Sequence, residues 1–130
     1  MDNNEITSAR RLRFYSCRQV TDAKSACEWL VRLRTTPNFT PVCFELSEIM
    51  EDGQFAEFRL PTSVGAEDLL NAAKKHAAQS ASIIGKYDGQ FITIGVNLQL
   101  IFISITTAND YTDVPDELVS QLQLFHLVMV

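Results

Sequence analysis

Three cysteines and two histidines are the side chains of this sequence best suited to nucleophilic or metal chemistry. Cys17, Cys27 and Cys43 form no CxxC pair, and neither His76 nor His126 stands at a spacing typical of zinc ligands. A nucleophilic site needs a thiolate beside a base that a carboxylate orients, and no local pattern brings these groups together. The sequence therefore predicts no metal site, no catalytic residue and no cofactor.

The acidic side chains and the glycines also lack a pattern for chemistry. Glu45 and Glu48 stand three residues apart, as do Asp110 and Asp113, but such pairs arise by chance in an acidic chain and are typical of solvated surface. No GxxxxGK[ST] motif is present to bind a phosphate. The residues give no positive evidence of an enzyme, so we expect a non-enzymatic protein.

Charge is spread unevenly along the chain. Residues 1–36 hold seven Arg and Lys against four Asp and Glu, whereas residues 37–130 hold four against twelve. Such an asymmetry steers a charged partner or a second copy of the chain. The net charge of −5 disfavours binding to a phosphate backbone, and only Tyr15 would accompany the arginines on the basic face of a first strand. We therefore expect a protein partner and not a nucleic acid.

The first strand and the apolar tail form the expected partner surface. Five of the six residues 125–130 are apolar, and they must be buried in the chain's own core or in a partner's groove. The predicted partner-binding residues are Arg11, Arg13, Tyr15, Phe125, Leu127 and Met129. The leading expectation for function is an interaction or regulatory module that forms a homodimer.

A pocket between the sheet and its helices is the alternative. Trp29 lies beside the apolar stripe of the first helix, while Cys43 and His76 fall on a neighbouring strand and helix. These three residues would line the pocket. In that case the protein would bind a small molecule or act as a minor enzyme.

Length and hydropathy indicate one cytoplasmic domain. Residues 1–9 are expected to be a flexible segment and residues 10–130 a single α+β domain. The first eight residues are polar and are not followed by an apolar stretch like that of a signal peptide. Three cysteines without a CxxC pair are typical of a protein in a reducing compartment. The apolar run 91–107 is shorter than the roughly 20 residues of a membrane helix and contains polar interruptions. We expect a cytoplasmic protein that does not enter a membrane.

Periodicity and turn residues predict the order β-α-β-β-α-β-β-β-α. The expected strands cover residues 10–19, 41–50, 54–60, 82–87, 90–94 and 98–106. The first expected helix begins at Thr21 or Asp22 and ends near residue 34, and the other two cover residues 66–79 and 112–121. The second helix would bury Ala66, Leu70, Ala73 and Ala77, and Asp113 would cap the third. The tail at 122–130 fits a helix and a strand equally well.

Side-chain pairing fixes the register of the first hairpin. A two-residue loop would place Glu48 opposite Glu57, and like charges in that position repel. A three-residue loop with Gly53 in the left-handed conformation places Glu45 opposite Arg59 instead. We therefore expect the three-residue loop.

The chain after the second helix is less tightly determined. Asp88-Gly89 indicates a hairpin over residues 82–95, but two-residue and three-residue loops both give acceptable pairs, so its register stays open. A turn near residues 95–97 would lead into the strand 98–106. The continuous apolar run 100–103 predicts that this strand is buried on both faces.

The expected architecture is an antiparallel sheet of about five to six strands with two helices on one face. The element order of residues 10–87 resembles that of ferredoxin-like folds, in which right-handed crossovers place both helices on one side. The order of residues 22–125 resembles the profilin- or roadblock-type order of small regulatory dimers. Both resemblances rest on element order and concern the fold.

Overall fold

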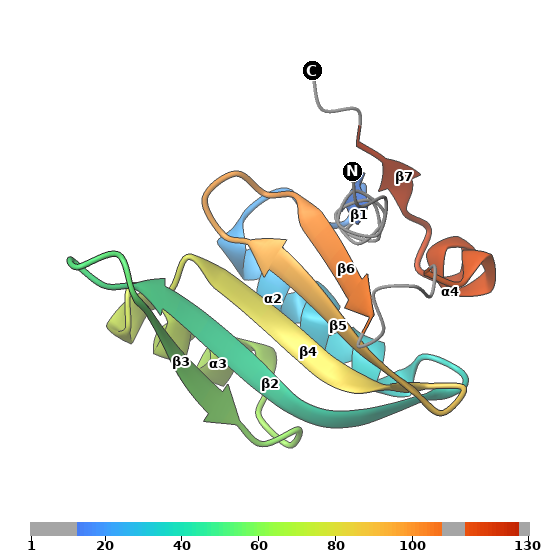
Figure 1. The fold of residues 1–130 in the computed structure, drawn as a ribbon, viewed down its shortest axis with the longest axis horizontal. Coiled ribbons are helices and arrows are strands. Elements are labelled where there is room, and N and C mark those ends of the chain that lie inside the picture. Colours follow the sequence, from blue (N-terminus) through green and yellow to red (C-terminus); the bar gives the residue numbers. More distant parts are fainter. Residues whose placement is uncertain (1–12, 108–113, 128–130) are drawn as a thin grey trace, which may run out of the picture.

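The computed structural model describes residues 13–107 and 114–127 and consists of one antiparallel sheet with helices on one side of it (Figure 1). The strands are β1 (Arg13–Ser16), β2 (Phe39–Ile49), β3 (Phe55–Leu60), β4 (Ser80–Tyr87), β5 (Gln90–Asn97), β6 (Ile103–Thr107) and β7 (Phe125–His126). The helices are α2 (Ala23–Arg32), the 3-10 helix η1 (Leu33–Thr35), α3 (Ala66–Lys75) and α4 (Asp116–Gln121). The strands are arranged in the order β3-β2-β4-β5-β6-β1-β7.

The α+β class and the antiparallel sheet are confirmed. In the described ranges the sheet has seven strands, against the five to six expected, because part of the ambiguous tail forms β7 beside β1. Within the tail, Phe125–His126 form a strand, residues 122–124 and 127 belong to no helix or strand, and residues 128–130 lie outside the described ranges. Residues 1–12, which include the segment expected to be flexible, also lie outside them.

A capping box starts α2 where the sequence predicts a helix. The Asp22 carboxylate accepts a hydrogen bond from the Ser25 backbone N–H at 2.7 Å, and the Ser25 hydroxyl accepts one from the Asp22 N–H at 3.0 Å. These bonds satisfy N–H groups that have no partner within a helix. The helix then buries Ala26, Cys27, Trp29 and Leu30 against the sheet.

The core lies between the sheet and the helices. In Figure 1 helices α2 and α3 lie behind the sheet, which confirms the prediction that the first two helices share one face. A row of apolar side chains crosses β2, β4, β5, β6 and β1 on this face: Leu46, Ala81, Val96, Ile103 and Tyr15. All five are at most 1% exposed, so β1 is fixed to the sheet by Tyr15 as well as by its backbone.

The first hairpin has the predicted register. Glu45 lies opposite Arg59, and Phe44 lies opposite Leu60. The Met50 N–H donates to the Gln54 carbonyl at 2.6 Å, which closes a three-residue loop. Gly53 has a φ of +83°, the left-handed conformation that this loop requires.

The second hairpin has a two-residue loop, because Tyr87 lies opposite Gln90. Asp88 and Gly89 have φ values of +50° and +83°, as a type I′ turn requires. The chain does not turn at residues 95–97, because β5 continues to Asn97.

The predicted strand 98–106 is wrong in its first half. The Asn97 carboxamide oxygen accepts from the N–H groups of Gln99 and Leu100 at 2.9 and 2.8 Å, and these bonds form a turn. Leu100 is 73% exposed in that turn, so burial of this run on both faces is also wrong. The strand β6 begins only at Ile103.

The second helix is shorter than predicted, and of the four side chains predicted to be buried only Ala73 is buried. It ends at Lys75, and Ala77 has a φ of +49°, which excludes it from the helix. Leu69, which is fully buried, takes the place expected for Leu70. The third helix begins at Asp116 with Pro115 as its N-cap, and Asp113 lies outside the described residues.

The position of β1 separates this fold from a ferredoxin-like unit. The elements from β1 to β4 follow each other in the expected order, but β1 pairs with β6 and β7, so β5 and β6 lie between it and β4. The profilin- or roadblock-type order of elements is present from α2 to α4.

Candidate functional site

The outer side of β3, here called the β3 edge, is an uncovered strand edge. In the described parts of the chain, β2 is the only strand beside β3. The six residues of β3 pair with β2 in one unbroken register and include no proline. Their backbone polar groups on the outer side can therefore pair with another chain.

The opposite end of the sheet is much shorter. The terminal strand β7 has two residues, Phe125 and His126, which pair with Ser16 and Tyr15. Natural sheets blunt their edges with very short strands, prolines, bulges or charges. Within residues 13–107 and 114–127 the sheet is blunted at β7, whereas β3 is long and regular.

Side chains of β3 alternate between the two faces of the sheet. Phe55, Glu57 and Arg59 are exposed on the face without helices, and Ala56, Phe58 and Leu60 are half-buried on the helix side. Phe55 is 65% exposed, which is unusual for a large apolar side chain on a strand.

Arg59 is held by its neighbour without being buried. Its Nε donates to the Glu45 carboxylate at 3.4 Å, and 72% of its side chain is exposed. An exposed ion pair of this kind contributes about 0–1 kcal/mol because solvent screens it. The guanidinium therefore remains available to a second carboxylate across the β3 edge.

The helix side of the β3 edge is closed by α3. The Phe58 ring stacks on His76, with the ring centroids 4.0 Å apart and the planes inclined by 22°. The first turn of α3 carries Glu67 and Asp68, and its last turn carries Lys74 and Lys75. The basic end of α3 thus lies next to β3, whereas Glu67 and Lys74 line a groove with Lys24 and Glu28 of α2.

The face of the sheet turned to the viewer in Figure 1, here called the open face, carries no helix in the described ranges. One row across it consists of Arg59, Glu45, Ser82, Gly95, Ser104 and Phe14. A Cβ at Gly95 would lie 2.7 Å from the Ser82 Oγ, so there is little room for a side chain at the centre of this face, and the neighbouring side chains are polar. Its margins are apolar, with Val42, Ile49 and Phe91 each at least 44% exposed.

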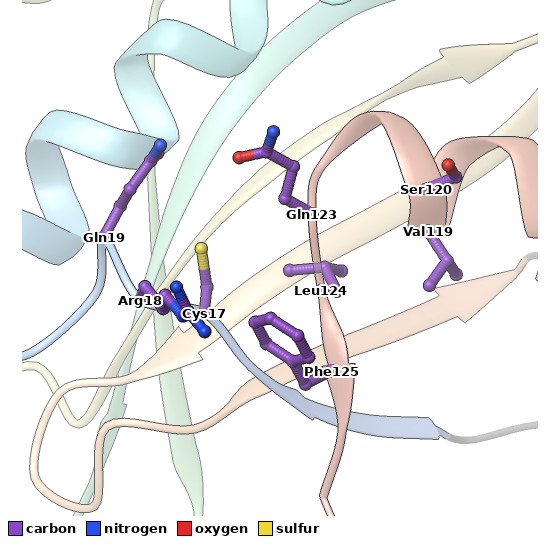
Figure 2. A pocket seen from close by; sticks show the side chains of 8 residues that line it. All are labelled: Cys17, Arg18, Gln19, Val119, Ser120, Gln123, Leu124 and Phe125. Carbon is purple, nitrogen blue, oxygen red and sulfur yellow. The ribbon is translucent and has the colours of Figure 1, made fainter.

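A groove of about 580 Å³ lies on the helix side between the turn after β1 and the segment from α4 to β7 (Figure 2). The groove is lined by Cys17, Arg18, Gln19, Val119, Ser120, Gln123, Leu124 and Phe125. The Arg18 guanidinium carbon lies 5.7 Å from the centroid of the Phe125 ring. The volume of the groove falls in the range of small-molecule pockets, which is roughly 300–1,000 Å³.

The residues predicted to bind a partner are only partly brought together. Phe125 is 50% exposed, and Arg13 and Leu127 are half-buried. Tyr15 is 1% exposed, and burial raises the pKa of its hydroxyl. Tyr15 is therefore a core residue and is removed from the predicted contact surface, while Arg11 and Met129 lie outside the described residues.

The residues of the alternative pocket do not meet. Trp29 is 2% exposed and packs in the core, and His76 stacks on Phe58 at the end of α3. Cys43 precedes the buried Phe44 on β2 and therefore points to the open face. The three side chains cannot line one pocket.

Cys27, a possible nucleophile by residue type, is buried in the core. All three cysteines are free, and burial, followed by the Glu28 charge, raises the pKa of Cys27 to about 11. A protonated, buried thiol is neither a nucleophile nor a metal ligand at neutral pH. Among residues 13–107 and 114–127, no group of three or more His, Cys, Asp or Glu side chains is placed to hold a metal.

In the same ranges, no helix has the length and apolar character needed to span a membrane. Comparisons with protein-family models, curated proteins and solved structures found no match for this chain.

The β3 edge was missed by sequence reasoning, although the hairpin that contains it was predicted. The pattern of Phe55–Leu60 was the available signal, but its meaning depends on β3 lying at the end of the sheet.

Proposed function

We propose that this chain is a non-enzymatic protein-interaction module of the cytoplasm and that it binds its partner through the β3 edge. The observation that carries this proposal is the contrast between the two ends of the sheet, a regular six-residue strand at one and a two-residue strand at the other. Addition of a strand to an open edge is a common mode of protein recognition.

The side chains of β3 support the same reading. β3 carries one charge of each sign, on Glu57 and Arg59, but unlike a protected edge it is neither very short nor interrupted by a proline or bulge. Here two apolar rings, Phe55 and Phe58, lie on opposite sides of the strand and would each pack against an added strand. Backbone hydrogen bonds would supply affinity, and these alternating side chains would supply specificity.

The state of the cysteines supports a non-enzymatic role in a reducing compartment. All three are free, and Cys17 and Cys27 are buried. Buried free thiols persist where the surroundings are reducing. The raised pKa of Cys27 also removes the most deeply buried thiol as a nucleophile.

Native mass spectrometry combined with hydrogen–deuterium exchange tests the proposal. We expect the purified protein to form a complex with itself or with a second protein, and the amides of Phe55–Leu60 to exchange more slowly in that complex. The Asp88-Gly89 turn, which lies at the end of a different hairpin, serves as the internal control and should not change. A complex that leaves β3 exchange unchanged would overturn the proposed contact.

A small-molecule function is favoured by one separate observation, the groove of about 580 Å³. Its apolar side chains, Val119, Leu124 and Phe125, together with Arg18, suit an apolar ligand with an anionic group. A ligand of this kind would add a reproducible mass to the protein. Ser120→Trp should remove that mass by filling the groove, and Glu117→Trp, at an exposed position that does not line the groove, should keep it.

A further inference from the structure

We infer that two copies of this chain pair through their β3 edges in an antiparallel register that places Phe58 opposite Phe58 of the second copy. The inference rests on the proposed function and names its partner, a second copy of the same chain. A two-fold axis perpendicular to the sheet relates the copies, so the sheet continues from one into the other and all helices stay on one side.

Side-chain alternation limits the registers that this pairing can adopt. Directly opposed side chains in an antiparallel pair share a face, so the two opposed residue numbers must both be odd or both be even. Pro61 follows β3 and cannot donate to a new strand. Two registers then pair five of the six residues, one centred on Glu57 and the other on Phe58.

Charge decides between these registers. Centring on Glu57 places Glu57 opposite Glu57 of the second copy, and the two carboxylates repel. Centring on Phe58 places Glu57 opposite Arg59 of the second copy, and symmetry forms this pair twice. It also places Ala56 opposite Leu60 and pairs the two Phe58 rings, so every opposed pair is favourable or neutral.

The exposed state of Arg59 makes this pairing accessible. The Glu45 carboxylate, 3.4 Å from Arg59, lies on the inner side of β3, and Glu57 of the second copy would lie on its outer side. A guanidinium has five N–H donors and can bond both carboxylates. The side chain therefore does not have to give up its present partner.

The helix side adds nothing to this complementarity. The two-fold axis makes the α3 helices of the two copies antiparallel, and the contact of His76 with Phe58 places the basic end of each α3 near the axis. The choice of register therefore rests on the charges of β3.

Two charge-reversal variants test the register. Glu57→Arg gives each copy two arginines at positions 57 and 59, and Arg59→Glu gives each copy two glutamates. In the Phe58-centred register either variant opposes like charges when it pairs with itself, whereas a mixture of the two restores both Glu–Arg pairs. Sedimentation velocity should show the wild type as a dimer, each variant alone with a dissociation constant roughly tenfold to several-hundred-fold higher, and the equimolar mixture near the wild type.

Controls separate this result from unfolding and from general electrostatics. Each variant should keep the wild-type far-ultraviolet circular dichroism, because both positions are exposed. Lys86→Glu, which reverses an exposed charge on β4, should leave the dissociation constant unchanged.

Four outcomes would overturn the inference, and they also separate it from the proposed function. If Arg59→Glu dimerises as the wild type does while Glu57→Arg and Arg59→Glu form a tighter mixed pair, the register is centred on Glu57. If the mixture associates no better than each variant alone, the contact does not involve these side chains. If the wild type is a monomer but a different protein slows hydrogen exchange at its β3 amides, the homodimer is excluded and the interaction module stands. If no partner slows exchange at these amides, both proposals fail.

Discussion

Replacing Gly85 by alanine tests how closely β2 and β4 are packed beside the bulge in β2. The register between these strands shifts between Pro41 and Cys43, directly opposite Gly85. A Cβ added at Gly85 would lie 2.5 Å from the Phe39 ring and 2.6 Å from the Thr40 carbonyl oxygen. Both distances are shorter than van der Waals contact, so neighbouring atoms must move.

The two contacts differ in how easily they relax. The Phe39 ring can turn within the core, but the Thr40 oxygen belongs to the backbone of β2, so the strand itself must shift. Overpacking of this kind costs about 1–3 kcal/mol, and we expect the upper end. Alanine also lowers the entropy of the unfolded chain, which offsets about 0.4–1 kcal/mol. The free energy of unfolding should therefore fall by about 2 kcal/mol, with a Tm decrease of roughly 6–10 °C.

Gly95→Ala is the matched control, since it is also a strand glycine in the sheet. Its Cβ would lie 2.7 Å from the Ser82 Oγ and 3.5 Å from the Ser104 Oγ, and no backbone atom is among its three nearest contacts. The Ser82 hydroxyl can rotate away, so the free energy of unfolding should change by less than about 1 kcal/mol. Urea unfolding of both variants measures the difference. Equal losses, or a neutral Gly85→Ala, would refute the distinction between backbone and side-chain contacts.

Two further predictions concern groups whose ionisation is coupled to folding. Hydrogen bonds from the Ser25 backbone N–H and hydroxyl lower the pKa of Asp22, so its contribution to stability is present above pH about 4 and lost as the pH falls below it. The stability advantage of the wild type over Asp22→Asn, measured by urea unfolding, should shrink between pH 5 and pH 2, because a free carboxyl has a pKa of roughly 4. A difference that stays constant over this range would contradict the capping bond. Burial raises the pKa of Cys27 from 9.0 to about 11, so its contribution is full below pH 9 and is lost as the pH rises to about 11. Relative to Cys27→Ala the wild type should lose stability over that window, and an unchanged difference would mean that the thiol is not buried in solution.

Local chemistry explains which parts of the fold could be predicted. The register of the first hairpin followed from the charges on Glu48, Glu57 and Arg59 and from the conformational freedom of Gly53, all within one short segment. The start of α2 was predicted at residue 21 or 22, and the structure selects Asp22 as its N-cap. Such features depend on neighbours in sequence, and the residue types therefore determine them.

One error concerned a local turn, and the others arose where distant contacts decide the structure. Leu100 reads as part of a buried strand, but the Asn97 side chain forms a turn that exposes it. Leu69 and Leu70 are both consistent with a buried helix face, and only the position of the sheet selects Leu69. The pairing of β1 with β6 depends on Tyr15 completing a row of the core, which no local pattern indicates.

The same limit applies to the candidate site. Exposure of Phe125 and burial of Tyr15 are decided by β7 pairing with β1, so a partner surface built from both could not be judged from their sequence. Trp29, Cys43 and His76 are separated because the sheet places Cys43 on its open face. The edge position of β3 became visible only with the strand order.

The difference in charge between residues 1–36 and 37–130 and the order of Glu57 and Arg59 within β3 act over different distances. Ionic screening limits interactions between exposed charges to roughly 8–10 Å at physiological salt, so the excess of arginine and lysine in residues 1–36 influences how often two molecules meet. Opposed side chains in a strand pair are only about 5 Å apart, so the sign of each residue decides which register holds. Because β3 carries glutamate and arginine two positions apart on one face, it is complementary to its own reversed copy, although the region around it is acidic. The local order of charges, and not their sum, therefore carries the proposal that β3 pairs with a second copy of itself.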